Sequence, residues 1–124
     1  MIDGSMNIKI IDFGFAVQSN KSNLDLFCGT PNYMSPEIVL KKEYRGPPND
    51  IWAFGVLTYK LITGSFPFAS ETTSGLNKRI LSLDYECPSF ISEDLKRVFY
   101  SIFKIDANGR PTANQILRFK FFST

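Results

Sequence analysis

The stretch Asn49-Asp-Ile-Trp-Ala-Phe-Gly-Val-Leu-Thr-Tyr-Lys-Leu-Ile-Thr-Gly64 decides the fold of this chain. Between positions 51 and 62 apolar residues occur on every side of a helical projection and only Lys60 is charged, which predicts a central helix that is buried all round. Prolines 47 and 48 precede the stretch, and Gly64 stands where a left-handed cap ends a helix. Such a helix is about 20 Å long, shorter than the roughly 30 Å core of a bilayer, so we exclude a membrane span.

The composition suits one domain or a piece of one. The chain has 124 residues, of which 44% are hydrophobic and 15% aromatic, enough for a buried core. Its net charge is +2 and it has no basic run, so we expect neither a nucleic-acid nor a membrane partner. The first six residues lack the basic start and apolar run of a signal peptide, which favours an intracellular protein without distinguishing cytoplasm from nucleus.

The sequence contains no histidine, which excludes His-based general-base triads and His-containing zinc sites. Cys28 and Cys87 are too few for a thiolate-only metal site, and their spacing matches no redox motif. We interpret them as two reduced thiols of an intracellular protein.

Before the central helix the sequence predicts little regular structure. Ile2 and the β-branched run Ile8–Ile11 favour a small N-terminal β-hairpin with turn residues at 3–5. The polar stretch Ala16–Phe27 shows no sustained period and is predicted to be a mobile loop. The fold class is therefore mainly α, with this hairpin followed by helices that pack around the central one.

The remaining elements are short helices with recognisable starts. Ser35 should cap one that ends near Lys41, a modest one should cover residues 73–82, and Thr112 with Gln115 forms a capping box for a last one. The helix that follows Ser92 is clearly amphipathic, and the phenylalanines near the C-terminus should dock on the core. The apolar residues of this helix are Leu95, Val98, Phe99, Ile102 and Phe103. The C-terminal phenylalanines are Phe119, Phe121 and Phe122.

Four short motifs could carry chemistry, although each alone has an ordinary explanation. A lone Asp12-Phe13-Gly14 is more often a strand-ending turn than a metal site, and isolated charged residues are by default solvated or begin a helix. The combination is more informative than any member. The chain contains, in order and at compatible spacing, Asp12-Phe13-Gly14, Cys28-Gly-Thr-Pro-Asn-Tyr-Met-Ser-Pro-Glu37, Asp50-Ile-Trp-Ala-Phe-Gly55 and Arg110-Pro-Thr112.

This order of motifs resembles the second half of the eukaryotic protein kinase domain, over residues 2–122. Cys28–Pro31 followed by Tyr33 looks like the Ser/Thr branch, and the stretches 44–48 and 66–68 are similar to the calmodulin-dependent and AMP-activated groups. The resemblance implies a partial kinase domain over residues 1–124, from the C-terminal lobe. It implies a phosphotransferase that uses ATP and Mg²⁺ and acts on protein substrates.

The resemblance also implies roles for individual residues. Asp12 would chelate the Mg²⁺ that bridges the ATP phosphates, Phe13 would set the orientation of Asp12, and Gly14 would let the backbone turn. Glu37 and Arg110 would form a buried structural ion pair. Asp50 would hydrogen-bond the backbone of the catalytic loop. The substrate loop would consist of Gly29, Thr30, Pro31 and Tyr33. Trp52 and Gly55 would have structural roles in the central helix.

Several groups that kinases need are not in this sequence. It has no Gly-rich loop, no strand lysine paired with a helix glutamate and no His-Arg-Asp loop, so Met1 is expected to lie just past the catalytic loop. The chain thus holds one of two metal-ligand positions and no catalytic base. Leu26 occupies the place where many relatives carry an activating phosphothreonine, which argues against regulation by phosphorylation there, although Ser19 and Ser22 remain in the loop.

Three interpretations follow. The chain belongs to a Ser/Thr protein kinase, or it is a catalytically inactive kinase-like remnant that binds proteins, or it is a helical domain with coincidental motifs, which the motif order disfavours. We expect the isolated chain to be inactive. We also expect it to associate, because a missing upstream helix would uncover part of the apolar ring around Trp52, Val56 and Tyr59.

Overall fold

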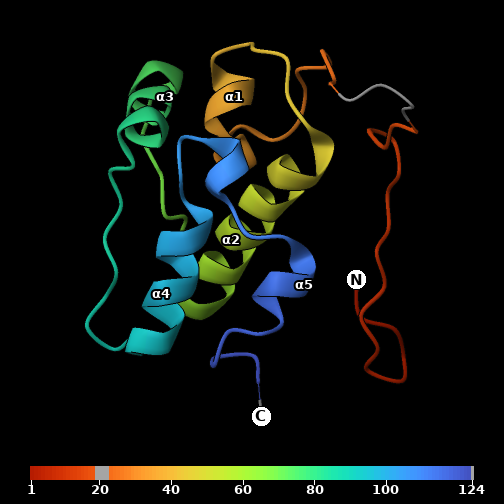
Figure 1. The fold of residues 1–124 in the computed structure, drawn as a ribbon, viewed down its shortest axis with the longest axis vertical. Coiled ribbons are helices and arrows are strands. Elements are labelled where there is room, and N and C mark those ends of the chain that lie inside the picture. The colour runs from red at the N-terminus through yellow and green to blue at the C-terminus, as the bar shows by residue number, and fades with distance from the viewer. Residues whose placement is uncertain (19–22, 124) are drawn as a thin grey trace.

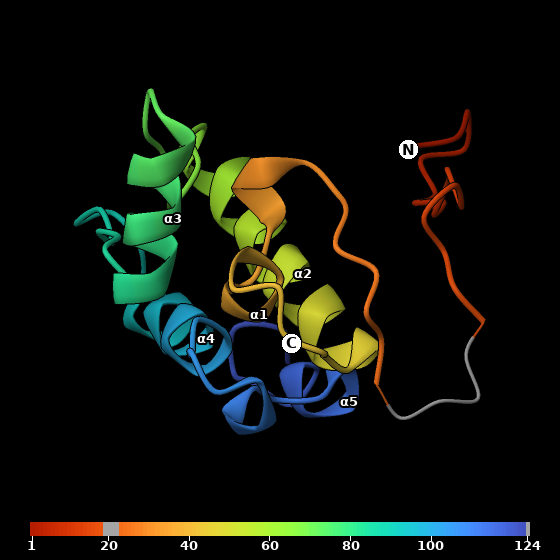
Figure 2. The ribbon, with the colours of Figure 1, turned by 90° about the horizontal axis from the view of Figure 1, so that it is seen from above.

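The computed structural model describes residues 1–18 and 23–123, as a helical body with an extended N-terminal segment beside it (Figures 1 and 2). Within these ranges β pairing is limited to isolated bridges, so the predicted mainly helical class is confirmed. None of the described helices is long and apolar enough to cross a membrane. In chain order the helices are η1 (Pro31–Tyr33), α1 (Pro36–Val39), α2 (Gly46–Thr63), α3 (Thr73–Ser82), α4 (Glu93–Ile102), η2 (Ala107–Gly109) and α5 (Ala113–Ile116).

Helix α2 runs through the middle of the body, with α4 packed along it (Figure 1). It starts at Gly46, so the prediction that Pro47 and Pro48 precede the helix is wrong. Both prolines fit the first turn, where the missing N–H groups have no intrahelical acceptor and the fixed φ angle suits a helix. Gly64 ends the helix as predicted, with φ 77° and its N–H donating to the carbonyl of Lys60 at 2.8 Å.

Only one face of α2 is buried in the described structure, so the prediction of burial all round is wrong. Trp52, Val56 and Tyr59 form the buried face, so the expectation that part of the apolar ring around them is uncovered does not hold for these three side chains. The opposite face is more exposed, although the ring of Phe54 lies 6.2 Å from that of Phe122. We call it the α2 outer face, and it consists of Phe54, Leu57, Leu61 and Ile62.

Helix α4 buries its apolar stripe against α2, as its period predicts. Ser92 caps it by accepting a hydrogen bond from the N–H of Leu95 at 3.3 Å. The two helices approach each other closely at Gly55, where a Cβ atom would lie 2.5 Å from Cγ2 of Ile102. A glycine is therefore needed at this crossing, because any side chain would push the helices apart.

The other predicted helices are present with small differences. Helix α3 has the predicted bounds, with the hydroxyl of Thr72 as its N-cap acceptor. The capping box at α5 is formed by Thr112 and Gln115, although the helix is only four residues long. Phe119 and Phe122 pack against the core as predicted, whereas Phe121 remains partly exposed.

The N-terminal segment forms far less structure than predicted. Ile2 and Ile8 form one antiparallel bridge and Met1 exchanges hydrogen bonds with Lys9, but no strand forms in this segment, and the isoleucines up to Ile11 are exposed. A two-stranded hairpin without a packed face is marginal in water, which explains why the pattern gives no more than a bridge. The predicted mobile loop is wrong at its end, because Leu24 pairs with Tyr44, while Ser19 and Ser22 lie outside the described residues.

Candidate functional site

The predicted substrate loop lies against the first half of α2. Gly29 has φ 125°, a backbone conformation that favours glycine, and Tyr33 closes a turn by donating its N–H to the carbonyl of Thr30 at 3.0 Å. Asn32 donates its side-chain amide to the carbonyl of Phe68 at 3.3 Å, which joins η1 to the loop after α2. A cavity of about 130 Å³ separates the loop from α2 near Asn49.

Ser35 connects the substrate loop to α2 rather than closing the first turn of α1. It occupies the N-cap position but makes no side-chain cap bond, so the capping prediction is wrong in its chemistry. Its buried hydroxyl instead donates to Oδ1 of Asn49 at 2.8 Å. The sequence analysis missed this contact, since nothing in the local sequence relates positions 14 residues apart.

Glu37 and Arg110 lie together at the base of the substrate loop. Nη1 and Nη2 of Arg110 donate to the two carboxylate oxygens at 2.7 and 2.8 Å, a bidentate pair across 73 positions of sequence. Both residues are buried. Burial opposes ionisation of Glu37, but the hydrogen bonds and charge of Arg110 outweigh it and hold the pKa of Glu37 below its ordinary value.

The remaining N–H groups of Arg110 bond to backbone carbonyls. Nε and Nη2 donate to Lys104 at 3.1 and 3.0 Å, and Nη1 also donates to Pro48 at 3.1 Å. A guanidinium has five N–H donors, and all five are used here. Arg110 also lies over the ring of Trp52, 5.0 Å from its centroid, so Trp52 supports the pair as well as the core.

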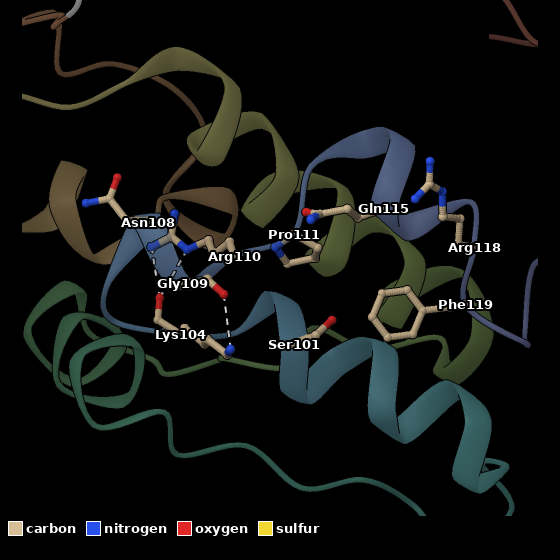
Figure 3. A pocket seen from close by; sticks show the side chains of 9 residues that line it. All are labelled: Ser101, Lys104, Asn108, Gly109, Arg110, Pro111, Gln115, Arg118 and Phe119. Carbon is tan, nitrogen blue, oxygen red and sulfur yellow. Dashed lines mark hydrogen bonds between the residues drawn. The ribbon is translucent and has the colours of Figure 1, made fainter.

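An open pocket of about 560 Å³ borders Arg110 on the side of α4, η2 and α5 (Figure 3). The side chain of Lys104 lies along one edge of this pocket, and its Nζ donates to the carbonyl of Gly109 at 3.0 Å. Arg118 and Phe119 line the opposite side of the pocket. Of the predicted site residues only Arg110 lines this pocket. It therefore gives no support to the predicted catalytic chemistry.

Asp50 lies near the start of α2 at a second pocket, of about 380 Å³. Desolvation by neighbouring protein atoms raises the pKa of its carboxyl group above the ordinary value. Within residues 1–18 and 23–123 no donor forms a hydrogen bond with this carboxylate. The structure therefore places Asp50 where it can accept a bond from outside this chain, but does not show the predicted one.

Asp12, Phe13 and Gly14 lie on the extended N-terminal segment, apart from the helical body (Figures 1 and 2). Asp12 has φ 59° and accepts a hydrogen bond from the N–H of Gly14 at 3.2 Å, which forms a local turn. The ring of Phe13 is 68% exposed. The structure thus brings together the predicted structural residues but does not bring Asp12 to the substrate loop.

The described residues offer one position for a magnesium ligand rather than a complete cage. No group of three or more His, Cys, Asp or Glu residues occurs among the residues that the structure describes. Mg²⁺ in nucleotide sites is commonly bound by one or two carboxylates, with phosphates and water supplying the other oxygens. An exposed Asp12 carboxylate fits one such position.

Comparison with known proteins agrees with this arrangement of motifs. The protein kinase domain family matches residues 1–122, so the chain belongs to this family. The sequence-based recognition of a eukaryotic Ser/Thr kinase domain, related to the calmodulin-dependent and AMP-activated groups, is thereby confirmed.

Three relatives illustrate the similarity. The chain is 37% identical to probable serine/threonine-protein kinase MARK-A of Dictyostelium discoideum, over 100% of this chain and 12% of the relative. It is 38% identical to serine/threonine-protein kinase SIK2 of Gallus gallus, over 98% of this chain and 15% of the relative. It is 39% identical to sperm motility kinase Z of Mus musculus, over 94% of this chain and 24% of the relative. The chain therefore spans less than a quarter of the length of each relative.

Proposed function

We propose that this chain is the C-terminal-lobe portion of a Ser/Thr protein kinase, which transfers the γ-phosphoryl group of ATP to a protein hydroxyl. The observation that carries the proposal is the buried Glu37–Arg110 pair, which fixes the end of the substrate loop to the far end of the lobe. Family membership supports the same reaction class. Phosphoryl transfer depends mainly on positioning and electrostatic stabilisation, so a rigid substrate loop is a direct contribution to catalysis.

Different residues of this chain have different roles in the proposed reaction. Residues Gly29–Tyr33 hold the protein substrate, and α2 supports them through Ser35 and Asn49. Asp12 supplies one oxygen ligand to Mg²⁺, which neutralises phosphate charge when bound. The chain has no residue in the position of the catalytic base, so that group comes from outside residues 1–124 in a working enzyme.

A second candidate function is a protein-binding module without catalysis. The observation that favours it is the independence of the substrate loop from the N-terminal segment. Asn32, Ser35 and Glu37 hold the loop through contacts to residues of the helical body, and none of these contacts involves residues 1–18. A loop held in this way can bind a peptide even when no phosphate is transferred.

A chimaera separates the two functions. Residues 1–122 would replace the matching segment of the SIK2 kinase domain, and transfer of radiolabelled phosphate to a peptide substrate would be measured. If the chain is a competent kinase portion, the chimaera is active and Asp12→Ala lowers its kcat at least 100-fold, the scale expected when a metal ligand that neutralises phosphate charge is lost. Asp84→Ala is the matched control, since among the described residues the carboxylate of Asp84 makes only an exposed ion pair with Arg79. A folded chimaera that binds peptide without transferring phosphate would establish the binding module instead.

The chain alone should show no phosphate transfer, because most positioning groups are outside it. The same radiolabel assay, with a basic and an acidic generic protein as substrates, tests this expectation. Transfer by the isolated chain that Asp12→Ala abolishes would contradict it.

A further inference from the structure

The segment before the substrate loop is attached to the chain just before α2. The backbones of Leu24 and Tyr44 exchange two hydrogen bonds, N–H of Leu24 to the carbonyl of Tyr44 at 2.7 Å and the reverse bond at 3.0 Å. The side-chain amide of Asn23 donates to Glu43 at 3.4 Å. These contacts form the isolated antiparallel bridge, which joins positions 20 residues apart.

The side chain of Tyr44 adds two contacts to the backbone bridge. Its hydroxyl donates to the carbonyl of Leu26 at 2.7 Å, and its ring lies 6.2 Å from that of Phe27. The Tyr44 hydroxyl is protonated and able to donate at neutral pH, and desolvation raises its pKa further above the ordinary value of 10.0.

We propose that Tyr44 is a positioning residue for the substrate loop: its hydroxyl holds the carbonyl of Leu26 and so fixes the chain that enters the loop at Cys28. The inference rests on the proposed function and deepens it. Leu26 has no hydroxyl that could be phosphorylated, so the entry is held by hydrogen bonds to Tyr44 rather than by a phosphate on this residue.

This attachment makes the substrate loop fixed at both ends. Glu37 and Arg110 hold the side that leads into α1, and Tyr44 holds the side that comes from Leu24. A loop with one free end retains many conformations, and ordering its residues when a substrate binds costs conformational entropy. Holding both ends removes this cost before binding, which lowers the KM for protein substrate without involving ATP.

Hydrogen exchange on the 124-residue chain tests the attachment without any kinase activity. Tyr44→Phe removes one hydroxyl and keeps the ring, and we expect the amide of Leu24 to exchange about two- to tenfold faster, the range for one lost hydrogen bond. Tyr100→Phe is the matched control, because its ring is 60% exposed and its hydroxyl forms no hydrogen bond within the described ranges. Equal exchange in Tyr44→Phe and the unchanged chain would overturn the proposal.

The chimaera with the SIK2 kinase domain tests the positioning role. Tyr44→Phe should raise the KM for peptide about two- to tenfold and leave the KM for ATP unchanged, whereas a general loss of stability would change both. Tyr100→Phe should change neither. Faster exchange of Leu24 with an unchanged peptide KM would overturn the positioning role.

The two measurements also separate this proposal from the proposed function. An inactive chimaera in which Tyr44→Phe still accelerates exchange would refute the kinase function and leave the attachment by Tyr44 established. An active chimaera in which Tyr44→Phe changes neither exchange nor peptide KM would refute the role of Tyr44 alone.

Discussion

The N-terminal segment and the helical body differ in what holds their residues in place. In residues 1–18 the apolar side chains of Ile8, Ile10 and Phe13 are exposed, and the hydrogen bonds are local. In the body Trp52 and Phe99 are fully buried, and bonds such as Glu37–Arg110 join distant positions. The segment carries the residue predicted to bind metal, whereas the body carries the residues predicted to support the loop. Packing within this chain therefore fixes the support but not the metal ligand.

The largest expected effect is in the body, at the buried ion pair. Glu37→Ala leaves the guanidinium of Arg110 without its carboxylate, and we expect a loss of about 3 to 5 kcal/mol in the free energy of unfolding. Chemical denaturation measures it, with Glu71→Ala as the exposed control. A double-mutant cycle with Arg110→Ala gives the coupling energy. Strictly additive single changes would show that the pair contributes no coupling.

The next effect contrasts two glycines, one in each region. Gly55→Ala should lose about 1 to 3 kcal/mol, because the added methyl group overlaps Ile102. Gly4→Ala in the N-terminal segment should change stability by less than about 0.5 kcal/mol, since nothing lies within 4 Å of the new Cβ. Equal losses at the two positions, measured by thermal unfolding, would remove the distinction between the regions.

The pH dependence of unfolding should reflect Glu37. Its pKa in the folded chain lies below the ordinary value of 4.5, so the folded state holds fewer protons in this range than the unfolded state. Its contribution is complete above about pH 4.5 and is lost as the pH falls towards the folded pKa. Glu37→Gln should therefore flatten the acid side of the stability curve, measured by denaturation from pH 6 to 3.

The smallest effect on stability is expected on the α2 outer face. Leu61 is 76% exposed, so Leu61→Glu should change the free energy of unfolding by less than about 0.5 kcal/mol. It should nevertheless lower the binding of a hydrophobic dye and the apparent size in gel filtration, because it breaks a contiguous apolar face. Leu117→Glu, at an exposed leucine that follows α5, is the control. A monomeric, dye-silent chain before any substitution would show that this face does not cause association.

Sequence patterns predicted elements well where the cause is local. The caps of α4 and α5 and the apolar stripe of α4 depend on residues three or four apart, and all are present. The extent of burial of α2 was mispredicted, because its composition does not say how many sides other helices cover. The start of α2 was mispredicted since prolines in a first turn and prolines before a helix look alike in sequence.

The candidate site also contains contacts that depend on tertiary packing rather than on neighbouring residues. The resemblance to kinases suggested the pairing of Glu37 with Arg110, which no local rule relates across 73 positions. Sequence patterns do not predict the hydrogen bonds Ser35–Asn49 and Tyr44–Leu26. A serine before a proline is typical of a helix cap, and a tyrosine in a loop is typical of an exposed position. Such contacts depend on tertiary approach, and a single sequence gives no signal for them.

The five bonds of Arg110 have a consequence for how the molecule opens. One planar group joins α1 through Glu37, the first turn of α2 through Pro48 and the chain after α4 through Lys104. Lysine would keep the charge but has three donors on a single atom and could not reach all three. Releasing any one of these elements leaves buried N–H donors of Arg110 without acceptors, so we expect the three to unfold as a single cooperative unit, with amide protection near Glu37, Pro48 and Lys104 lost together rather than in steps.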